Sequence, residues 1–473
     1  MKHYFRSKQG YLVVLALVFG GILFSLIAAF LGFIVNENRA ETTKVNKERA
    51  LDVAEAGLDY YKWYLAHFPN DVTNGTTTPG PYVHTYVDPE DGPIGNFSLD
   101  IKGNSVCGDL ASIDIHSTGT VSVAPGITRT VYGRYARPTV SEFSYIINSN
   151  VWAGADRTIT GPYYSNGGIR MDGTNNSTVS SGLDTWLCTS SFGCSPNATQ
   201  NGVFGAGPNS SLWSFPSPPI NFTGLSVDLS NMKTKAQGSG LYFAPSGNYG
   251  YHLIFKANGT FDLYRVMNTV SMYGTADGST YALERNVISA ESFVGNYTPP
   301  AGCAVVFVED KLWLEGVVTK KVTVAAADVT TPGVSPSIIL TNNITYSTSN
   351  GTVGLLAVAE DSVLIGLDSP DGMTLEGIFA AQNGRFGRNH YVSSGVYKVP
   401  SAYNASILRT SLTVHGTIVS NGREGTKWVS GATVLSGYQT RANSYDRSLV
   451  SDPPPLTPHT SATYKFIEWR ELN

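Results

Sequence analysis

The sequence predicts a mainly β protein with a long N-terminal α-helix, in which a helical stalk precedes a right-handed parallel β-helix; a β-sandwich is the alternative. Three observations predict this fold class. An apolar run at 11–35 continues as a helix-compatible segment to about residue 68. Residues 70–140 alternate apolar and polar side chains, as strands with one buried face do. Short apolar runs then recur through 141–450, with Gly, Asn, Asp or Ser at the bends.

The first apolar run has the length of a membrane span. Residues 11–35 carry no charge, and about twenty apolar residues cross a bilayer core as a helix. A secretory signal peptide is the alternative, but its apolar region is shorter and ends at a small-residue cleavage site. Basic residues precede the run, whereas Glu37 and Arg39 cancel after it. We therefore expect a single-pass membrane protein that contacts lipid, with a cytoplasmic leader at 1–10 and the bulk outside.

Residues 36–68 are expected to continue the helix outside the membrane as an amphipathic half. The apolar side chains of this segment recur at three- and four-residue steps, which places them in one stripe along a helix. They are Leu51, Ala54, Leu58, Tyr61 and Leu65. Pro69 ends the helix. The stripe is therefore expected to pack on the exterior part of the protein.

Gly10 stands at the junction between the basic tip and the apolar run. The sequence Lys8-Gln9-Gly10-Tyr11-Leu12 there resembles the type IV prepilin signal. In that family a peptidase at the cytoplasmic face cuts after the glycine and N-methylates the next residue. The resemblance implies that Gly10 and Tyr11 form a processing site, that Tyr11 is the mature N-terminus, and that a prepilin peptidase is a partner.

The fifth residue after this junction departs from the major-pilin pattern. Major pilins have a glutamate there, which is thought to pair with a neighbouring subunit's amine during assembly, whereas this chain has Leu15. Minor pilins of the PilX type commonly lack that glutamate. The stretch ALDVAEAGL at 50–58 is similar to the A-x-x-A-E-A-G-L segment of PilX-like N-terminal regions. The resemblance covers about residues 7–68 and implies a minor, terminal subunit whose partners are pilus or pseudopilus subunits.

The composition is that of an exterior globular protein. Only 14% of the 473 residues are charged, and the net charge of -4 leaves no basic footprint for nucleic acid. Cys188 and Cys194 bracket a short polar loop, where a disulfide suits an oxidising compartment. Even parity leaves Cys107 and Cys303 as a second pair. The spacing does not fit a zinc site, so neither a metal nor another cofactor is expected.

The exterior region divides at about residue 140. In pilin-like proteins a small sheet packs on the exposed half of the first helix, and residues 70–140 are assigned that role. Beyond it, the segment 161–168 is echoed at 376–384 and 415–422, each ending in Asn-Gly. Asn and Gly tolerate the left-handed conformations of β-helix corners. Weak repetition suits a solenoid, although a β-sandwich has a similar strand spacing.

The middle and the end of the chain depart from this repetition. Residues 174–300 combine a Pro-rich stretch with hairpin-like strands around a turn at 256–259, which suggests an insertion projecting from the β-helix. Its Tyr, Trp, Ser and Asn content suits adhesion, with plain loop decoration as the alternative. Residues 451–473 are expected to form a Pro-rich linker and a capping tail.

Catalysis is weighed because β-helices often act on polysaccharides. Two opposed carboxylates hydrolyse glycosides, and a calcium-dependent lyase would add a basic residue as base. The candidates are Glu309, Asp310, Glu315, Glu360, Asp361, Asp368 and Asp371, with Arg385 and Arg388 as bases. Such residues at strand ends are more often solvated turn residues, and no nucleophile, metalloprotease or phosphate-loop motif is present. No catalytic residue is therefore assigned.

The leading hypothesis is a non-enzymatic minor pilin or pseudopilin that displays an adhesive or interaction domain on a pilus-like filament or on the cell envelope. Its ligand would be a glycan or a surface protein. Two alternatives stay open. One is a membrane-tethered β-helix enzyme that acts on polysaccharide, and the other is a structural surface protein without a pilus connection.

Overall fold

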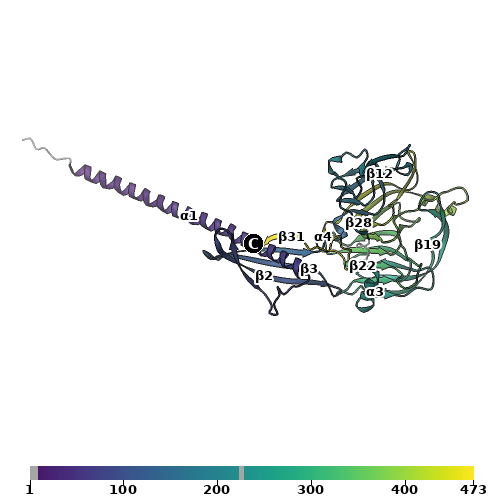
Figure 1. Cartoon of the computed structure of the whole chain (residues 1–473), viewed down its shortest axis with the longest axis horizontal. Coiled ribbons are helices and arrows are strands. Elements are labelled where there is room, and N and C mark those ends of the chain that lie inside the picture. Colours follow the sequence, from purple (N-terminus) through teal and green to yellow (C-terminus); the bar gives the residue numbers. More distant parts are fainter. Residues whose placement is uncertain (1–8, 223–227, 473) are drawn as a thin grey trace, which may run out of the picture. The chain divides into compact units, whose positions relative to one another are not determined.

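The computed structural model describes residues 9–222 and 228–472, which form two compact units (Figure 1). Unit 1 contains residues 9–103, 113–135 and 468–472, and unit 2 contains residues 104–112 and the described residues of 136–467. A long N-terminal helix is followed by mostly β structure, which confirms the predicted fold class at that level.

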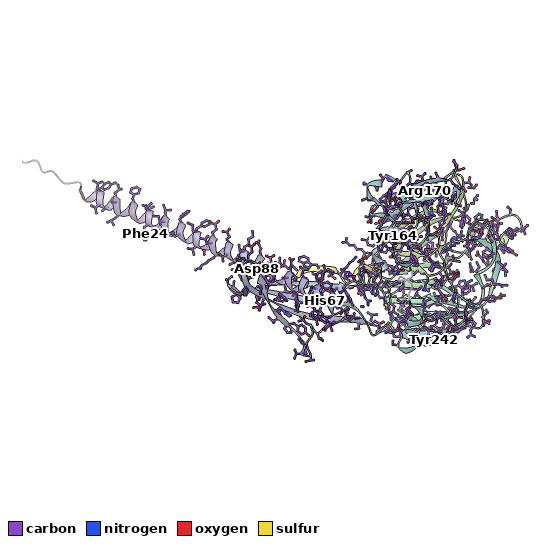
Figure 2. All side chains as sticks on the ribbon, viewed as in Figure 1. Phe24, His67, Asp88, Tyr164, Arg170 and Tyr242 are labelled. Carbon is purple, nitrogen blue, oxygen red and sulfur yellow. A yellow bond between two sulfur atoms is a disulfide. The ribbon has the colours of Figure 1, made fainter. Side chains whose placement is uncertain are left out.

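Helix α1 (Gln9–His67) continues without interruption from the apolar run into the predicted stalk. Side chains from residue 11 to 45 are exposed, and Phe24 projects from the helix without a packing partner among the described residues (Figure 2). Burial begins at Ala50, and in the predicted stripe Ala54, Leu58, Tyr61 and Leu65 are at most 2% exposed, whereas Leu51 is partly buried. A Cβ at Gly119 of the sheet would collide with the backbone of Ala50 and Ala54. Glycine at this position therefore allows the close approach of helix and sheet.

The sheet of unit 1 has the order β1-β2-β3-β4-β31. Its strands are β1 (Tyr82–Asp88), β2 (Gly92–Val106), β3 (Asp109–Val121), β4 (Ala124–Ala136) and β31 (Lys465–Leu472). Strand β31 comes from the segment expected to be a linker and capping tail, and it forms the edge strand of this sheet. The sheet therefore includes strands from both ends of the exterior region.

Unit 2 is built on a long ladder of parallel strands, called ladder A here. Each strand pairs in parallel with the next one of the series. The order is β16 (Leu241–Phe243), β20 (Val305–Val308), β22 (Lys321–Ala326), β24 (Gly354–Ala359), β26 (Gly372–Ala381), β28 (Leu408–Ser420), β5 (Tyr145–Ile147), β8 (Tyr163–Ser165), β11 (Val179–Ser181) and β15 (Trp213–Ser214).

Three further parallel ladders complete the coils of unit 2. One contains β17 (Tyr251–Phe255), β21 (Leu312–Val318), β23 (Ile338–Tyr346), β25 (Val363–Ile365) and β27 (Phe386–Gly387). A second joins β28 to β30 (Thr433–Ser444), β7 (Arg157–Thr160) and β10 (Thr174–Asn175). The third contains β6 (Val151–Ala153), β9 (Ile169–Met171) and β14 (Val203–Phe204).

The order along ladder A differs from the order along the chain. The chain first forms β5, β8, β11 and β15, then continues through residues 215–240, which include α3 (Leu229–Gly238), and resumes at the other end with β16. The last coils, β28 and β30, pair with the first ones, β5 and β7. We call this junction the seam. The strands β20 to β26 form the aliphatic half of ladder A, and β5 to β15 form its polar half.

At one register position along ladder A, the aliphatic half has Val and Ala, whereas the polar half has two serines. Residues paired at this position are Val308, Ala326, Ala359, Ala381, Ser420, Ile147, Ser165 and Ser181. At the following corner, Asn166 donates to Asn148 (2.7 Å), and Asn148 donates to Asn421 (2.8 Å). Two of these asparagines belong to the repeated Asn-Gly segments seen in the sequence. The repeats therefore mark corners that stack on one another.

Both faces of ladder A are buried, which explains the continuous apolar runs in its strands. One face, including Val306, Leu355 and Ala357, contributes to the largest core cluster. The other face, including Phe307 and Val358, packs with residues of α3. The aliphatic half thus needs no alternation of apolar and polar residues.

Strand β29 (Lys427–Ser430) forms a hairpin with β30, and two further hairpins of the segment 174–300 extend from these ladders. Strand β18 (Phe261–Thr275) pairs with β17 on one side and with β19 (Tyr281–Tyr297) on the other, both antiparallel. The other hairpin of this segment joins β12 (Thr185–Cys188) to β13 (Ala198–Asn201). The segment 174–300, expected as a projecting insertion, thus supplies ladder strands β11, β15, β16 and β17 as well as both hairpins.

Candidate functional site

The predicted processing site lies at the start of α1. Gly10 is in the helix, and the side chains of Tyr11 and Leu15 are 74% and 39% exposed. The leader at 1–8 lies outside the described residues. The processing of Gly10 and Tyr11, and the role of Leu15, stay predictions.

The exposed half of α1 has the properties of a membrane anchor. It is the one helix, among the described residues, that is long and apolar enough to cross a membrane. Burying such a surface in lipid removes the cost of exposing it to water. The chain therefore carries one candidate span, near its N-terminus.

The candidate carboxylates bind neighbouring groups; Glu315 lies within strand β21, and the others occupy corners of the ladders. Glu309 accepts hydrogen bonds from Lys233, Tyr242 and Thr330. The others have partners as well: Asp310 with Ser246, Glu315 with Thr341, Glu360 with Ser335, Asp361 with Ser337, Asp368 with Ser406 and Asp371 with Thr410. These contacts are those of residues that stabilise turns.

A cluster that the sequence did not reveal lies around Glu284 of β19. The Glu284 carboxylate accepts hydrogen bonds from the Tyr391 hydroxyl (2.8 Å), from Asn286 (3.0 Å) and from Asn389. Arg385 donates to Asn389, and the Lys311 ammonium donates to the Asn286 side chain (2.7 Å). We call these residues, together with Arg388, the Glu284 cluster. Its members come from β19 and from the segments around β21 and β27, so their proximity depends on the ladder register.

The Glu284 cluster contains three cations and one carboxyl group. Lys311, Arg385 and Arg388 donate to neutral oxygens, and none of them forms an ion pair within the part of the chain that the structure describes. Cation–π contacts stabilise two of them: Lys311 lies 5.1 Å from the Trp313 ring centroid, and Arg388 lies 5.4 Å from that of Tyr391. Besides Glu284, the carboxylates of Asp310, Asp361 and Glu424 act on Lys311 or Arg385 from beyond ion-pair distance.

Burial shifts the titration of this cluster. Burial raises the pKa of Glu284, although the hydrogen bonds from Tyr391 and Asn389 oppose that rise. Burial also lowers the pKa of Lys311 to about 8, against the attraction of Glu284 and Asp310. Several perturbed groups in one place are a feature of functional sites, and also of structural networks.

An aromatic rim adjoins the Glu284 cluster. The rings of Tyr281 and Tyr397 are stacked, with centroids 4.6 Å apart and planes 7° apart, and Tyr273 meets Tyr397 edge-on at 5.2 Å. The Tyr281 hydroxyl lies 3.3 Å from His390, whose ring is 5.5 Å from that of Trp428. Tyr273 and Tyr397 are 37% and 44% exposed. The rim therefore presents aromatic surface to solvent next to polar groups.

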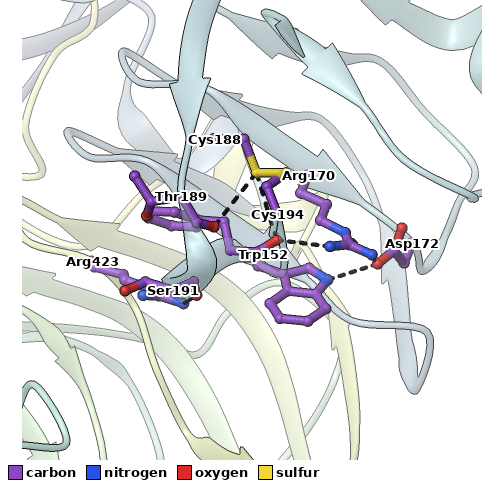
Figure 3. Close-up of a disulfide and its surroundings, with 9 residues drawn as sticks. Trp152, Arg170, Asp172, Cys188, Thr189, Ser191, Cys194 and Arg423 are labelled. Carbon is purple, nitrogen blue, oxygen red and sulfur yellow. Dashed lines mark hydrogen bonds and ion pairs between the residues drawn. A yellow bond between two sulfur atoms is a disulfide. The ribbon is translucent and has the colours of Figure 1, made fainter. Parts of the chain in front are cut away.

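Hydrogen-bonded polar side chains surround the Cys188–Cys194 disulfide, the pairing that the sequence predicted (Figure 3). Arg170 donates to the Phe192 carbonyl (2.8 Å) and to Asp172 (2.8 Å), and it lies 4.3 Å from the Trp152 ring centroid. Arg423 donates to the Ser191 carbonyl (3.0 Å). The disulfide loop is thus fixed by two arginines, both of whose charges point at loop carbonyls.

The second disulfide joins Cys107 to Cys303. Cys107 lies in the turn between β2 and β3, and Cys303 precedes β20. Lys235 of α3 donates to the Cys107 carbonyl (2.8 Å) and to Asp109 (2.8 Å). Covalent and ionic contacts therefore attach this turn within unit 2.

A cavity of 330 Å³ in unit 2 is lined by residues such as Arg137, Asn231, Pro454 and His459. Two of its carboxylates are already paired, Asp109 with Lys235 and Asp452 with Lys321. No group of three or more His, Cys, Asp or Glu side chains that could hold a metal ion lies among the described residues.

No protein-family model and no curated protein matches the chain. Among solved structures, it is similar to the crystal structure of the competence-associated pilin ComZ from Thermus thermophilus, with 13% identity. The alignment covers 90% of this chain and 97% of that one, with a TM-score of 0.30. At such a score the two folds are not shown to be alike.

Proposed function

We propose that the protein is a PilX-like minor pilin or pseudopilin that displays an interaction domain on a pilus-like filament or on the cell envelope. The observation that carries this proposal is the division of α1. Its first half, which begins directly after Gly10, is apolar and exposed, and its second half is buried against the sheet of unit 1. An exposed apolar half requires lipid or neighbouring helices around it.

The proposed arrangement places the N-terminus in the cytoplasm and the β structure outside, because the basic residues precede the span. Two disulfides support an oxidising exterior compartment. We further propose that the ladders of unit 2 form a right-handed parallel β-helix. The parallel pairing of successive coils supports it, since the sheets of a β-sandwich are antiparallel.

We propose that unit 2 acts by binding and not by catalysis. Support comes from the hydrogen bonds that hold the candidate carboxylates at their turns. Incubating the purified full chain with polygalacturonate tests this point, and we expect the chain length of the polymer to stay constant. Shortening that is lost in both Glu360→Gln and Asp361→Asn would establish the enzyme alternative instead.

Mass spectrometry of the protein isolated from its host tests the pilin proposal. We expect a mature chain that lacks residues 1–10 and begins with N-methylated Tyr11. A Gly10→Arg variant provides the matched control and should retain the leader. An intact Met1 in the wild-type protein would contradict the proposal.

A further inference from the structure

We infer that the Glu284 cluster and its aromatic rim form a binding site for an acidic polysaccharide. The inference rests on the proposed display function, for which it names a ligand class and a site. Neither the processing site nor the turn carboxylates take part in it.

Lys311 and Arg385 are the two partly buried cations of the cluster, whereas Arg388 is fully buried. The acceptors of Lys311 and Arg385 are amide and carbonyl oxygens. A partly buried cation without a carboxylate is costly, and an anionic ligand removes part of that cost. The guanidinium of Arg385 and the ammonium of Lys311 both bind carboxylates well, and the former can do so through two parallel bonds.

Glu284 already receives hydrogen bonds from Tyr391, Asn286 and Asn389. Burial raises its pKa, whereas the hydrogen bonds from Tyr391 and Asn389 and the charges of Lys311 and Arg385 lower it. Because both oxygens of this carboxylate already have donors, Lys311 and Arg385 remain the groups that attract an acidic ligand.

The rim provides the aromatic part of the site. Tyr273, Tyr281, Tyr397 and Trp428 supply rigid rings with polar edges, which give contact area at a low cost in side-chain entropy. A sugar ring has an apolar C–H face and a rim of hydroxyl groups. The exposed rings of Tyr273 and Tyr397 suit the face. The combination of these rings with Lys311 and Arg385, which form no direct ion pair among the described residues, thus favours a uronate-containing chain.

The hairpin β18–β19 and the segment after β27 hold the rim together. Thr275 and His390 form a backbone bridge between these segments, with hydrogen bonds of 3.1 Å and 2.9 Å. A Cβ at Gly274 would collide with the Glu284 carboxylate. Glycine at 274 therefore leaves room for Glu284 beside the rim.

Titration of the full chain in detergent micelles with labelled polygalacturonate, alginate and hyaluronate tests the inference. We expect binding to at least one polymer, and binding about tenfold weaker in Tyr397→Ala and in Arg385→Gln. Phe293→Ala, an exposed aromatic on the same hairpin, and Lys256→Gln, an exposed lysine paired with Asp262, are the matched controls and should bind like the wild type. Circular dichroism checks that each variant is folded.

Two further probes separate saccharide recognition from general attraction to anions. Methyl-esterified polygalacturonate should bind about tenfold more weakly than the free acid. Poly-glutamate should bind more weakly than the best uronate polymer. Equal binding of poly-glutamate, equal binding of the ester, no loss in Tyr397→Ala, or no binding to any of the three polymers would each overturn the inference.

The outcome is independent of the test of the proposed function. Absent binding together with an N-methylated Tyr11 would remove this site and leave the pilin proposal intact. Binding together with an intact Met1 would leave the site and remove the pilin proposal.

Discussion

On one side of the seam ladder A is aliphatic, and on the other side it is polar. The aliphatic half stacks Val and Ala at the register position where the polar half has Ser165 and Ser181, both fully buried. The Ser165 hydroxyl donates to the Ser149 carbonyl (2.6 Å), and that of Ser181 donates to the Gly167 carbonyl (2.9 Å). Methyl groups of neighbouring strands can pack together in more than one pairing register, whereas these hydrogen bonds form in only one.

The seam differs from both halves in how its strands are connected. Within each half the strands of ladder A follow one another along the chain, so each coil is placed beside the previous one by its own connection. At the seam the neighbours are far apart in sequence, and the Arg157–Glu424 pair joins them: a guanidinium nitrogen of Arg157 lies 2.6 Å from Glu424. The Arg157 guanidinium also donates to the Tyr145 hydroxyl (2.9 Å). Buried polar groups thus specify the register where chain continuity does not.

Removing each disulfide in turn gives the largest contrast between the two halves. The Cys107–Cys303 bridge, beside the aliphatic half, spans 196 residues, whereas the Cys188–Cys194 bridge, beside the polar half, spans 6. Loop-closure entropy predicts a loss of about 5 kcal/mol in the free energy of unfolding for a Cys107→Ala and Cys303→Ala variant, against about 2 kcal/mol for the other pair. Denaturant titration of the full chain measures both. A larger loss from the short loop would contradict the entropic account.

Breaking the ion pair tests the seam itself. Glu424→Gln leaves the Arg157 charge buried without a counter-charge, and we expect a loss of about 3–5 kcal/mol in the free energy of unfolding. The double variant Arg157→Met and Glu424→Leu removes both charges and should lose less. If the double variant were as unstable as the single one, the charges of the pair would not be what stabilises the seam.

Single buried side chains probe the register position of the polar half and the packing of the aliphatic half. Ser165→Ala removes one hydroxyl and leaves the Ser149 carbonyl and the Gly167 amide unsatisfied, which is expected to cost about 1–3 kcal/mol. Leu355→Met in the aliphatic half conserves volume and should cost less than about 1.5 kcal/mol. Thermal and denaturant unfolding measure both costs. If Leu355→Met cost more than Ser165→Ala, packing would contribute more to stability at these sites than the buried hydrogen bonds do.

The smallest expected effect comes from comparing two buried cations: Lys311, which forms no direct ion pair among the described residues, and Arg157, which is paired with Glu424. The folded pKa of Lys311, about 8, lies below its usual value, so the unfolded chain binds more protons between pH 8 and about 10.5. The free energy of unfolding should therefore rise across that window, on the order of 1 kcal/mol after screening by solvent. Lys311→Met should flatten the rise. Arg157, whose charge Glu424 stabilises against burial, should contribute no such slope.

The sequence was informative where a periodic pattern or a motif carries the signal. The helix stripe at Leu51, Ala54 and Leu58, the strand alternation, and the Asn-Gly corners were all visible as spacing. So was the loop between Cys188 and Cys194. Each of these signals is local, because it depends on residues a few positions apart.

What the sequence could not reveal is long-range. No pattern indicates that β28 stacks on β5, since stacking order depends on which apolar edges meet in three dimensions. The Arg157–Glu424 pair and the Glu284 cluster follow from that order. Glu284, Lys311 and Arg385 come from three separate segments, and only the third was considered as a candidate. Even parity alone suggested Cys107 and Cys303.

The Cys107–Cys303 bridge has a mechanical consequence. A pull between α1 and a point beside β21 is transmitted along the shortest covalent path, which crosses from β2 to β20 through this disulfide. That path bypasses residues 108–302, which include the whole polar half. Extended, these residues would otherwise add about 650 Å to the covalent connection. The bridge thus keeps the covalent connection between β2 and β20 short even if the segment between them unfolds.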